Sequence, residues 1–276
     1  MSEVSEEMSE NKDMMRKKQE SSTRRQDAEY SGPRSTIGPN LNFSATEAYK
    51  RLRTNLLFSF AGEPGCRVIG VTSSLRGEGK TTTSCNIAYT LAEMGKRVLL
   101  IDADMRLPNV YKSLNIRQSP GLSNLLTGVN SNDSLVQYSG IHEKLSVITS
   151  GDIPPNPSEL LASKRMSDSI ELLKKEFDYI VIDLPPVDAV TDALIVAKLT
   201  DGMVLVARQS YVDKPSLDNT LRQMRFQNIN IIGFFLNYAE EEGGYYRRRY
   251  YKKKGYYSDY GYGEKNTASA ASKTVK

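Results

Sequence analysis

"VTSSLRGEGKTTT", residues 71–83, joins a short β-branched run to a helix-forming segment through a glycine-rich loop. The pattern is close to the P-loop motif G-x-x-x-x-G-K-[ST], with Ser74 in place of the first glycine. Glycines let backbone N–H groups turn toward phosphate oxygens, the lysine adds a positive charge, and the threonine hydroxyl suits Mg²⁺. The alternative is a glycine-rich turn with an incidental lysine. The predicted nucleotide-binding residues are Ser74, Gly77, Glu78, Gly79, Lys80, Thr81 and Thr82.

Two more apolar runs end in carboxylates. "VLLIDADMRLP" (98–108) leads to Asp102 and Asp104, and "DYIVIDLPPV" (178–187) leads to Asp183. Ligands of open α/β sheets bind at the carboxyl ends of the strands, so these side chains are expected beside the glycine-rich loop. There they can hold Mg²⁺ or accept a proton from an attacking hydroxyl. The alternative for the first pair is a helix-capping aspartate and a surface aspartate.

Apolar runs alternate with helical patterns from residue 67 onward, which predicts a mostly parallel sheet with helices on both faces. The fold class is therefore an α/β P-loop NTPase. Strands are expected at 67–73, 97–104, 145–151, 178–186, 202–209 and 230–238. Helices are expected from Ser44, with Glu47 completing a capping box, then over 81–95, 158–176, 188–199 and 214–227. Leu52, Leu56 and Phe60 fall on one face of the first helix, and Asn156 is the expected N-cap of the helix near 158.

Composition narrows the class of protein. The chain has 276 residues, a net charge of +4, no run of 18 apolar residues and a polar N-terminus without an apolar signal core. Two cysteines are too few for a disulfide framework, which favours a cytosolic protein with reduced thiols. We expect three parts: a disordered segment 1–40, a P-loop domain 41–239 and a flexible tail 240–276.

The tail contains "GGYYRRRYYKKKGYYSDYGYGEK", residues 243–265, in which eight tyrosines are interleaved with the six Arg and Lys residues of 247–249 and 252–254. The tyrosines are Tyr245, Tyr246, Tyr250, Tyr251, Tyr256, Tyr257, Tyr260 and Tyr262. A packed core does not have this composition, and disordered segments are usually poor in aromatics. One reading is a basic aromatic tail that binds RNA or lipid.

The trio "SSLRGEGKTTT", "LLIDADMRLP" and "IVIDLPP" resembles the bacterial tyrosine kinases (BY-kinases) of capsular and extracellular polysaccharide synthesis. The resemblance covers about residues 40–262 and includes "GLSNLLTG" (121–128), "GDIPPNPSELLAS" (151–163) and the tyrosine cluster. It implies that the eight tail tyrosines are phosphorylated by the kinase itself, in trans. Phosphorylation adds about −1.5 to −2 charges per tyrosine, so a few modified sites would cancel the basic residues of the tail.

The resemblance also implies ATP and Mg²⁺ as cofactors and assigns roles to the polar residues. The catalytic set is Lys80, Asp102 and Asp104, and the metal set is Thr81, Asp104 and Asp183. Asp102 is the candidate to accept or orient the tyrosine proton, whereas Arg106 either stabilises phosphate or pairs with a carboxylate. "EAYKRLRTNL" (47–56) is similar to the E-x-x-R-x-x-R helix that joins subunits into a ring; Glu47 and Arg53 match, and Lys50 replaces the first arginine. From spacing alone this helix reads as an amphipathic core helix with a solvated basic face.

The implied partners are a membrane adaptor of the polysaccharide chain-length-determinant type, further copies of the chain in a ring, and a phosphotyrosine phosphatase, with no nucleic acid. The adaptor would recruit a cytoplasmic kinase to the inner face of the cell membrane. Two other functions remain open on the sequence. One is a nucleotide-switch ATPase that controls assembly or membrane residence with water as the acceptor, and the other is a scaffold that binds ATP without turnover.

Overall fold

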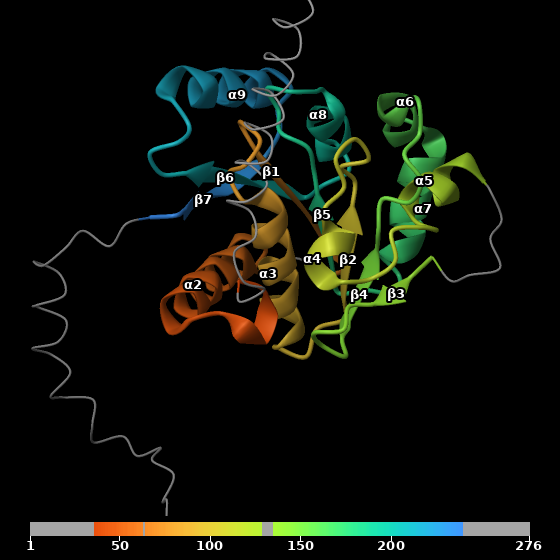
Figure 1. Cartoon of the computed structure of the whole chain (residues 1–276), viewed down its shortest axis with the longest axis horizontal. Coiled ribbons are helices and arrows are strands. Elements are labelled where there is room, and N and C mark those ends of the chain that lie inside the picture. The colour runs from red at the N-terminus through yellow and green to blue at the C-terminus, as the bar shows by residue number, and fades with distance from the viewer. Residues whose placement is uncertain (1–35, 63, 129–134, 240–276) are drawn as a thin grey trace, which may run out of the picture. The chain divides into compact units, whose positions relative to one another are not determined.

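The computed structural model describes residues 36–62, 64–128 and 135–239, and within them seven strands form one sheet (Figure 1). The strand order is β3-β4-β2-β5-β1-β6-β7; β3 is antiparallel to β4 and all other pairs are parallel. The strands are β1 (Arg67–Ser73), β2 (Val98–Asp102), β3 (Gln137–Tyr138), β4 (Leu145–Ile148), β5 (Tyr179–Asp183), β6 (Gly202–Arg208) and β7 (Ile231–Asn237). The predicted mostly parallel sheet is confirmed.

The helices lie on both faces of this sheet, as predicted (Figure 1). One face packs on α2 (Phe43–Ser59), α3 (Lys80–Ala92) and α4 (Val110–Leu114). The other packs on α5 (Leu122–Thr127), α6 (Pro157–Leu161), α7 (Lys164–Leu173), α8 (Asp192–Ala197) and α9 (Lys214–Phe226). Because successive side chains of a strand point to opposite faces, Leu99 and Ile101 of β2 enter one core and Val98 and Leu100 enter the other.

The central strands are buried on both faces, which explains why their sequences are continuous apolar runs without alternation. Leu52 and Leu56 of α2 and its C-cap residue Phe60 are buried in the core between α2, α3 and the sheet, as predicted from their spacing. Within the described residues, none of the helices combines the length and apolar composition needed to span a bilayer.

Several predicted boundaries are wrong. Helix α2 begins at Phe43, and its N-cap is Asn42, whose side chain accepts a hydrogen bond from the Ala45 N–H; Ser44 lies inside the first turn. The helix predicted over 158–176 is two helices, because the Ser163 hydroxyl donates to the Leu160 carbonyl and accepts from the Met166 N–H to start α7.

Three short elements, β3, α4 and α5, had no prediction because each is too short to show a period. Asn156 is the N-cap residue of α6, as predicted, but no backbone N–H caps onto its side chain. Its side-chain amide instead donates to the Glu159 carboxylate.

The N-terminal boundary also needs correction, since part of the segment predicted to be disordered is ordered. Gly38–Asn40 form a 3₁₀ turn (η1), and Ile37 packs against the core beneath α2 and α3. The Asn86 side chain accepts from the Gly38 N–H at 2.9 Å and donates to the Thr36 carbonyl at 2.8 Å. Residues 1–35 and 240–276 lie outside the described residues, so the two terminal parts stay predictions.

Replacing Gly121 by alanine is expected to destabilise the fold by about 2 kcal/mol or more, because the new Cβ would lie 2.3 Å from the Thr149 carbonyl oxygen. Gly233 in β7 has no heavy atom within 4 Å of the same position. Gly233→Ala is therefore the control, and urea unfolding measures both. Equal midpoints for the two variants would contradict this packing.

Candidate active site

The loop between β1 and α3 has the backbone of a phosphate cradle. Gly77 and Gly79 adopt positive φ values of 87° and 91°, which favour glycine. A Cβ on Gly79 would also lie 2.0 Å from the side-chain nitrogen of Asn237. No side chain caps α3, so the N–H groups of its first turn, which include those of Lys80, Thr81 and Thr82, are open to an anion.

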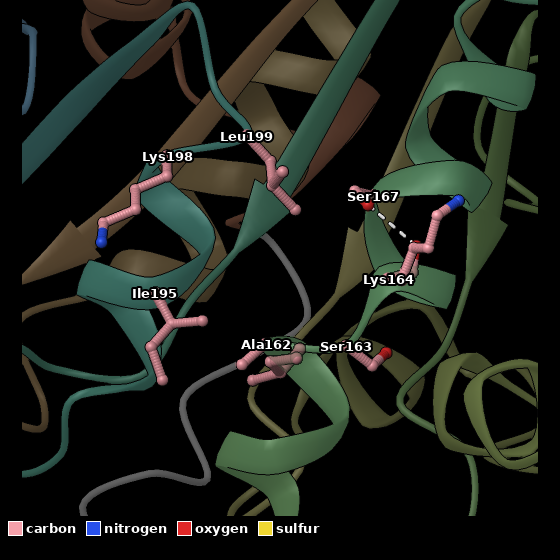
Figure 2. Close-up of a pocket in the computed structure, with 8 residues that line it drawn as sticks. Ala162, Ser163, Lys164, Ser167, Ile195, Lys198 and Leu199 are labelled. Atoms are coloured by element: carbon pink, nitrogen blue, oxygen red, sulfur yellow. Dashed lines mark hydrogen bonds between the residues drawn. The ribbon is translucent and has the colours of Figure 1, made fainter.

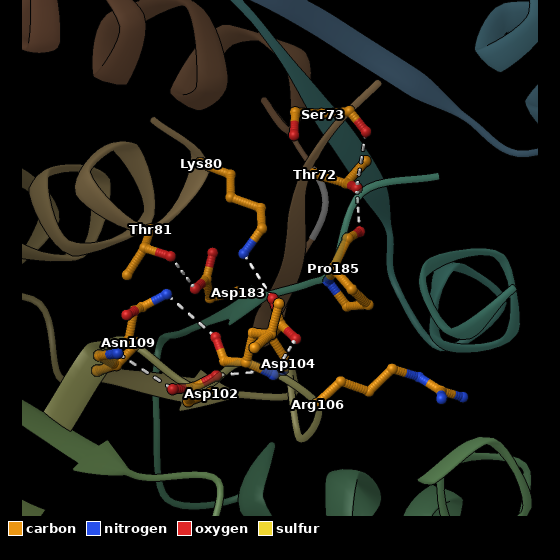
Figure 3. Close-up of polar contacts among 12 residues, drawn as sticks. Thr72, Ser73, Lys80, Thr81, Asp102, Asp104, Arg106, Asn109, Asp183 and Pro185 are labelled. Carbon is orange, nitrogen blue, oxygen red and sulfur yellow. Dashed lines mark hydrogen bonds and ion pairs between the residues drawn. The ribbon is translucent and has the colours of Figure 1, made fainter. Parts of the chain in front are cut away.

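Lys80 points into a cluster of carboxylates (Figure 3). Its ammonium nitrogen is 2.8 Å from Asp104 Oδ2, and both side chains are at least nine-tenths buried. Burial alone lowers the pKa of this amine, but the charges of Asp183 and Asp104 outweigh burial, and the net pKa is raised. Lys80, the first residue after the loop, therefore stays protonated.

Asp183 binds the start of α3 (Figure 3). Its two oxygens accept hydrogen bonds from the Thr81 hydroxyl at 2.7 Å and from the Ser84 hydroxyl at 2.9 Å. Burial and the neighbouring carboxylate of Asp104 raise the pKa of Asp183, although Lys80 and these hydroxyls act against the rise. The predicted residues Lys80, Thr81, Asp104 and Asp183 are thus brought together.

Asp102 lies beside Asp183, because the two residues are paired across β2 and β5. Its oxygens accept from the N–H groups of Asp104 and Val110, each at 3.1 Å, so the carboxylate shapes the turn after β2. Burial, followed by the charge of Asp183, raises its pKa well above the usual value. A higher pKa makes the carboxylate a better proton acceptor for a phenol.

Two other predicted loop residues, Ser74 and Glu78, differ in whether their side chains already have hydrogen-bond partners. The Ser74 hydroxyl is buried and has no hydrogen-bond partner among the described residues, which leaves a donor free for a phosphate oxygen. Glu78 is different, because its carboxylate is already occupied by two backbone N–H groups. Its carboxylate accepts from the N–H groups of Leu75 at 2.6 Å and Arg208 at 2.9 Å.

The Arg106 side chain points away from Lys80 (Figure 3). It pairs with the carboxylate of Asp192, which is the second of its two predicted roles. Its Nε is 2.8 Å from Asp192 Oδ2, and its Nη2 donates to Ser158 Oγ at 2.9 Å. Ser158 in turn donates to Asp192 at 2.6 Å. These contacts tie the loop after β2 to α6 and α8.

The donor chemistry of the site suits Mg²⁺, which binds carboxylate and hydroxyl oxygens and keeps several ligands from water and phosphate. The described residues contain no ready-made group of three Asp, Glu, His or Cys side chains arranged around a metal position. Thr81, Asp104 and Asp183 would supply part of the coordination shell, and phosphate and water would supply the rest.

The predicted subunit-contact residues lie on α2. Glu47 and Lys50 form an exposed ion pair at 3.1 Å, and each side chain is 44% accessible. Arg53 instead donates to the Thr90 carbonyl of α3 at 2.9 Å. The eight predicted tail tyrosines lie outside the described residues.

A separate cavity of about 320 Å³ lies between the α6–α7 junction and the end of α8 (Figure 2). It is lined by Leu161, Ala162, Ser163, Lys164, Ser167, Ile195, Lys198 and Leu199. None of these residues belongs to the loop or to the carboxylate cluster. The cavity is therefore distinct from the candidate active site.

A protein-family model described as an AAA domain matches residues 66–226. Tyrosine-protein kinase YwqD of Bacillus subtilis (strain 168) is 36% identical over 192 residues, which are 70% of this chain and 80% of YwqD. The chain belongs to the bacterial tyrosine kinase family. Membership confirms the resemblance stated above and the protein-tyrosine kinase activity that it implied.

Solved structures agree with this assignment. The chimerical protein CapA2B2 has a TM-score of 0.67 at 31% identity and covers 71% of this tyrosine kinase and 85% of its own chain. The kinase domain of the Escherichia coli tyrosine kinase ETK has a TM-score of 0.65 at 30% identity, with 73% and 80% covered. The predicted P-loop fold is confirmed, and with it a nucleotide site.

Sequence reasoning missed two contributors to the site of this kinase. Ser84 sits one turn after Lys80, and that spacing could have placed its hydroxyl beside Asp183. Asn237, whose side chain donates to the Glu78 carbonyl at 2.9 Å, carries no comparable signal. Asn237 lies 159 positions after Glu78 in the sequence.

Thr81→Ala is expected to weaken Mg²⁺-dependent nucleotide binding about tenfold, because it removes the hydroxyl that Asp183 holds. Thr81→Ser keeps that hydroxyl and is the matched control. Titration of a fluorescent ADP analogue with Mg²⁺ and with EDTA measures the effect. An equal loss in both variants, or a loss that persists in EDTA, would contradict the role of the hydroxyl.

Proposed function

We propose that this tyrosine kinase uses Mg·ATP to phosphorylate Tyr245–Tyr262 of a neighbouring copy, and so regulates the synthesis and export of capsular or extracellular polysaccharide. The observation that carries the proposal is the cluster at the carboxyl edge of the sheet. There Lys80 and Thr81 at the start of α3 meet Asp104 and Asp183 within hydrogen-bond distance.

Each of these residues has one part in the reaction. Lys80 would bind the phosphates in place of Asp104, and the Asp104 carboxylate would then be available to the metal. Thr81, Asp104 and Asp183 would hold Mg²⁺, which would neutralise charge on the transferred phosphoryl group. Phosphoryl transfer depends mainly on positioning and charge neutralisation, so the buried cluster supplies most of what the reaction requires.

Asp102 is the proposed acceptor of the tyrosine proton. Its raised pKa brings it closer to that of a phenol, which reduces the mismatch in proton transfer. Both oxygens already accept one backbone hydrogen bond, and each carboxylate oxygen has a second lone pair available. The bonds to Asp104 and Val110 keep the carboxylate fixed in one orientation while a substrate hydroxyl approaches.

Subunits would meet through α2. Its exposed surface combines the Glu47–Lys50 pair with two large apolar side chains, Phe43 and Phe58, which are 82% and 75% accessible. Aromatic side chains beside charged groups are typical of protein interfaces. A second copy of this chain, in a ring, is the proposed occupant.

The proposed activator is a membrane adaptor that recruits a cytoplasmic kinase to the inner face of the membrane. The likeness to the chimerical protein CapA2B2 supports an adaptor of that kind. A phosphotyrosine phosphatase would reverse the reaction.

Mixing two variants tests the reaction and its direction. Lys80→Ala removes the catalytic cation and keeps the tail, whereas a variant with all eight tail tyrosines changed to phenylalanine keeps the site and has no acceptor. With Mg·ATP and the cytoplasmic segment of an adaptor, phosphate is expected on Tyr245–Tyr262 of the Lys80→Ala protein only in the mixture. Intact-mass and peptide mass spectrometry measure it.

Two results would contradict this reaction. If wild-type protein phosphorylates its tail but the mixture does not, transfer occurs within one chain. If ATP is consumed and every tail stays bare, the chain is a switch ATPase with water as the acceptor. Circular dichroism checks that Lys80→Ala remains folded.

Lys50→Glu is expected to dissociate the ring, because it replaces the positive member of the Glu47–Lys50 pair with a negative side chain on the proposed contact surface. Arg51→Glu makes the same charge change at an exposed neighbouring position and is the control. Light scattering after gel filtration measures the mass of each variant. Identical assemblies for the two variants would contradict a contact centred on Glu47 and Lys50.

A further inference from the structure

The P-loop is held from outside by the ends of β6 and β7. The Asn237 amide donates to the Glu78 carbonyl at 2.9 Å, Arg208 Nη1 to the Gly77 carbonyl at 3.4 Å, and the Tyr211 hydroxyl to the Arg76 carbonyl at 3.0 Å. Three consecutive carbonyl groups of the loop therefore point toward one side. We call the contacts made by Arg208, Tyr211, Asn237 and the Glu78 carboxylate the clasp.

The direction of these carbonyls fixes the direction of the amides. In a trans peptide the N–H of each residue points opposite to the preceding C=O. Carbonyls of Arg76, Gly77 and Glu78 that face the clasp therefore aim the N–H groups of Gly77, Glu78 and Gly79 away from it. Those are the N–H groups that a P-loop offers to phosphate oxygens.

Glu78 completes the clasp with its side chain. The residue is fully buried, and its two carboxylate oxygens accept from N–H groups of different segments, Leu75 within the loop and Arg208 at the end of β6. A buried carboxylate is costly unless hydrogen bonds compensate for lost water. Two bonds to separate segments make Glu78 a link between the loop and the sheet.

Asn237 sits directly over the loop. Its nitrogen occupies the space that a side chain on Gly79 would take, and its oxygen accepts from the Tyr238 N–H at 3.0 Å. Arg208 is fixed as well, since its guanidinium lies 4.9 Å from the centre of the Tyr211 ring and 4.2 Å from that of Tyr238. Asn237 and Arg208 are therefore each held in place by more than one contact.

We propose that Glu78 and Asn237 are positioning residues that set phosphate affinity by orienting the P-loop N–H groups before the nucleotide binds. The inference rests on the nucleotide site of the proposed function and requires no phosphoryl transfer. Neither side chain needs to touch the ligand. Their removal should weaken every ligand that the loop holds by phosphate, with or without a base.

Asn237→Asp is the decisive variant. It keeps the oxygen that accepts from Tyr238 and turns a donor to the Glu78 carbonyl into a repelling oxygen. Asn86→Asp is the matched control. The Asn86 side chain also accepts from one backbone N–H, that of Gly38 in η1, and donates to one carbonyl, that of Thr36. Glu78→Gln is a second test, since an amide can accept only one of the two N–H groups without setting donor against donor.

Binding of a fluorescent ADP analogue to the full-length protein is measured directly and by competition with inorganic tripolyphosphate. We expect Asn237→Asp and Glu78→Gln to bind both ligands about tenfold more weakly than wild type. Asn86→Asp should bind as wild type does, with a thermal midpoint lowered as much as that of Asn237→Asp.

Three outcomes would overturn the proposal. They are unchanged affinity in Asn237→Asp, an equal loss in Asn86→Asp, and a loss for the ADP analogue without a loss for tripolyphosphate. The last would mean that Asn237 contacts the base or ribose. Because binding is measured without transfer, failure of tail phosphorylation would leave this result intact.

Discussion

The ammonium of Lys80 lies among three buried carboxylates, so the active-site edge of this sheet carries an excess of buried negative charge. Asp102 and Asp183 are fully buried, Asp104 is almost so, and the pKa values of Asp102 and Asp183 are raised. One cation does not balance three carboxylates at this depth, so the cluster has a strong tendency to acquire positive charge or protons. A divalent cation and a proton-accepting role both satisfy that tendency, which makes the cluster suited to metal-assisted phosphoryl transfer.

Parallel pairing of the strands places these charges together. Asp102 and Asp183 are direct partners across β2 and β5, and Val71 of β1 pairs with Asp183 on the other side. The last residues of β2 and β5 therefore lie level with Val71, two residues before the end of β1, and α3 follows β1 at the same edge. A slip of one residue in β2 or β5 would turn its aspartate to the opposite face. The apolar residues that fix the register thus also fix the catalytic geometry.

Much of this could be predicted from the sequence because the signals are local. Lys80 and Thr81 follow the glycine-rich loop, and each aspartate follows an apolar run, so chain order alone brings the four residues to one edge. The clasp could not be predicted. Its contacts join Glu78 to Arg208, and Asn237 to the Glu78 carbonyl, at sequence separations of 130 and 159 residues. Arg106 is intermediate, since its charge was evident but its partner Asp192 was 86 positions away. The break between α6 and α7 depends on the hydroxyl of Ser163, and the spacing of apolar residues gives no sign of it.

Helix α2, the proposed site of subunit contact, and the P-loop both contact strand β7. Strand β7 is an edge strand in the described sheet, paired with β6 alone, so its position depends strongly on the helix that covers it. Tyr49 of α2 stacks on Phe235 of β7 with ring centres 4.9 Å apart, and Asn237 follows two positions later on the same strand. Tyr49 lies between Glu47 and Lys50, the exposed pair on α2. A neighbouring copy that packs on this pair would contact α2, whose buried face packs on β7 through Tyr49 and Phe235. Asn237 at the end of β7 donates to the Glu78 carbonyl. The proposed contact surface on α2 and the P-loop are therefore connected through β7, by the stacking of Tyr49 on Phe235 and by the hydrogen bond from Asn237 to the Glu78 carbonyl.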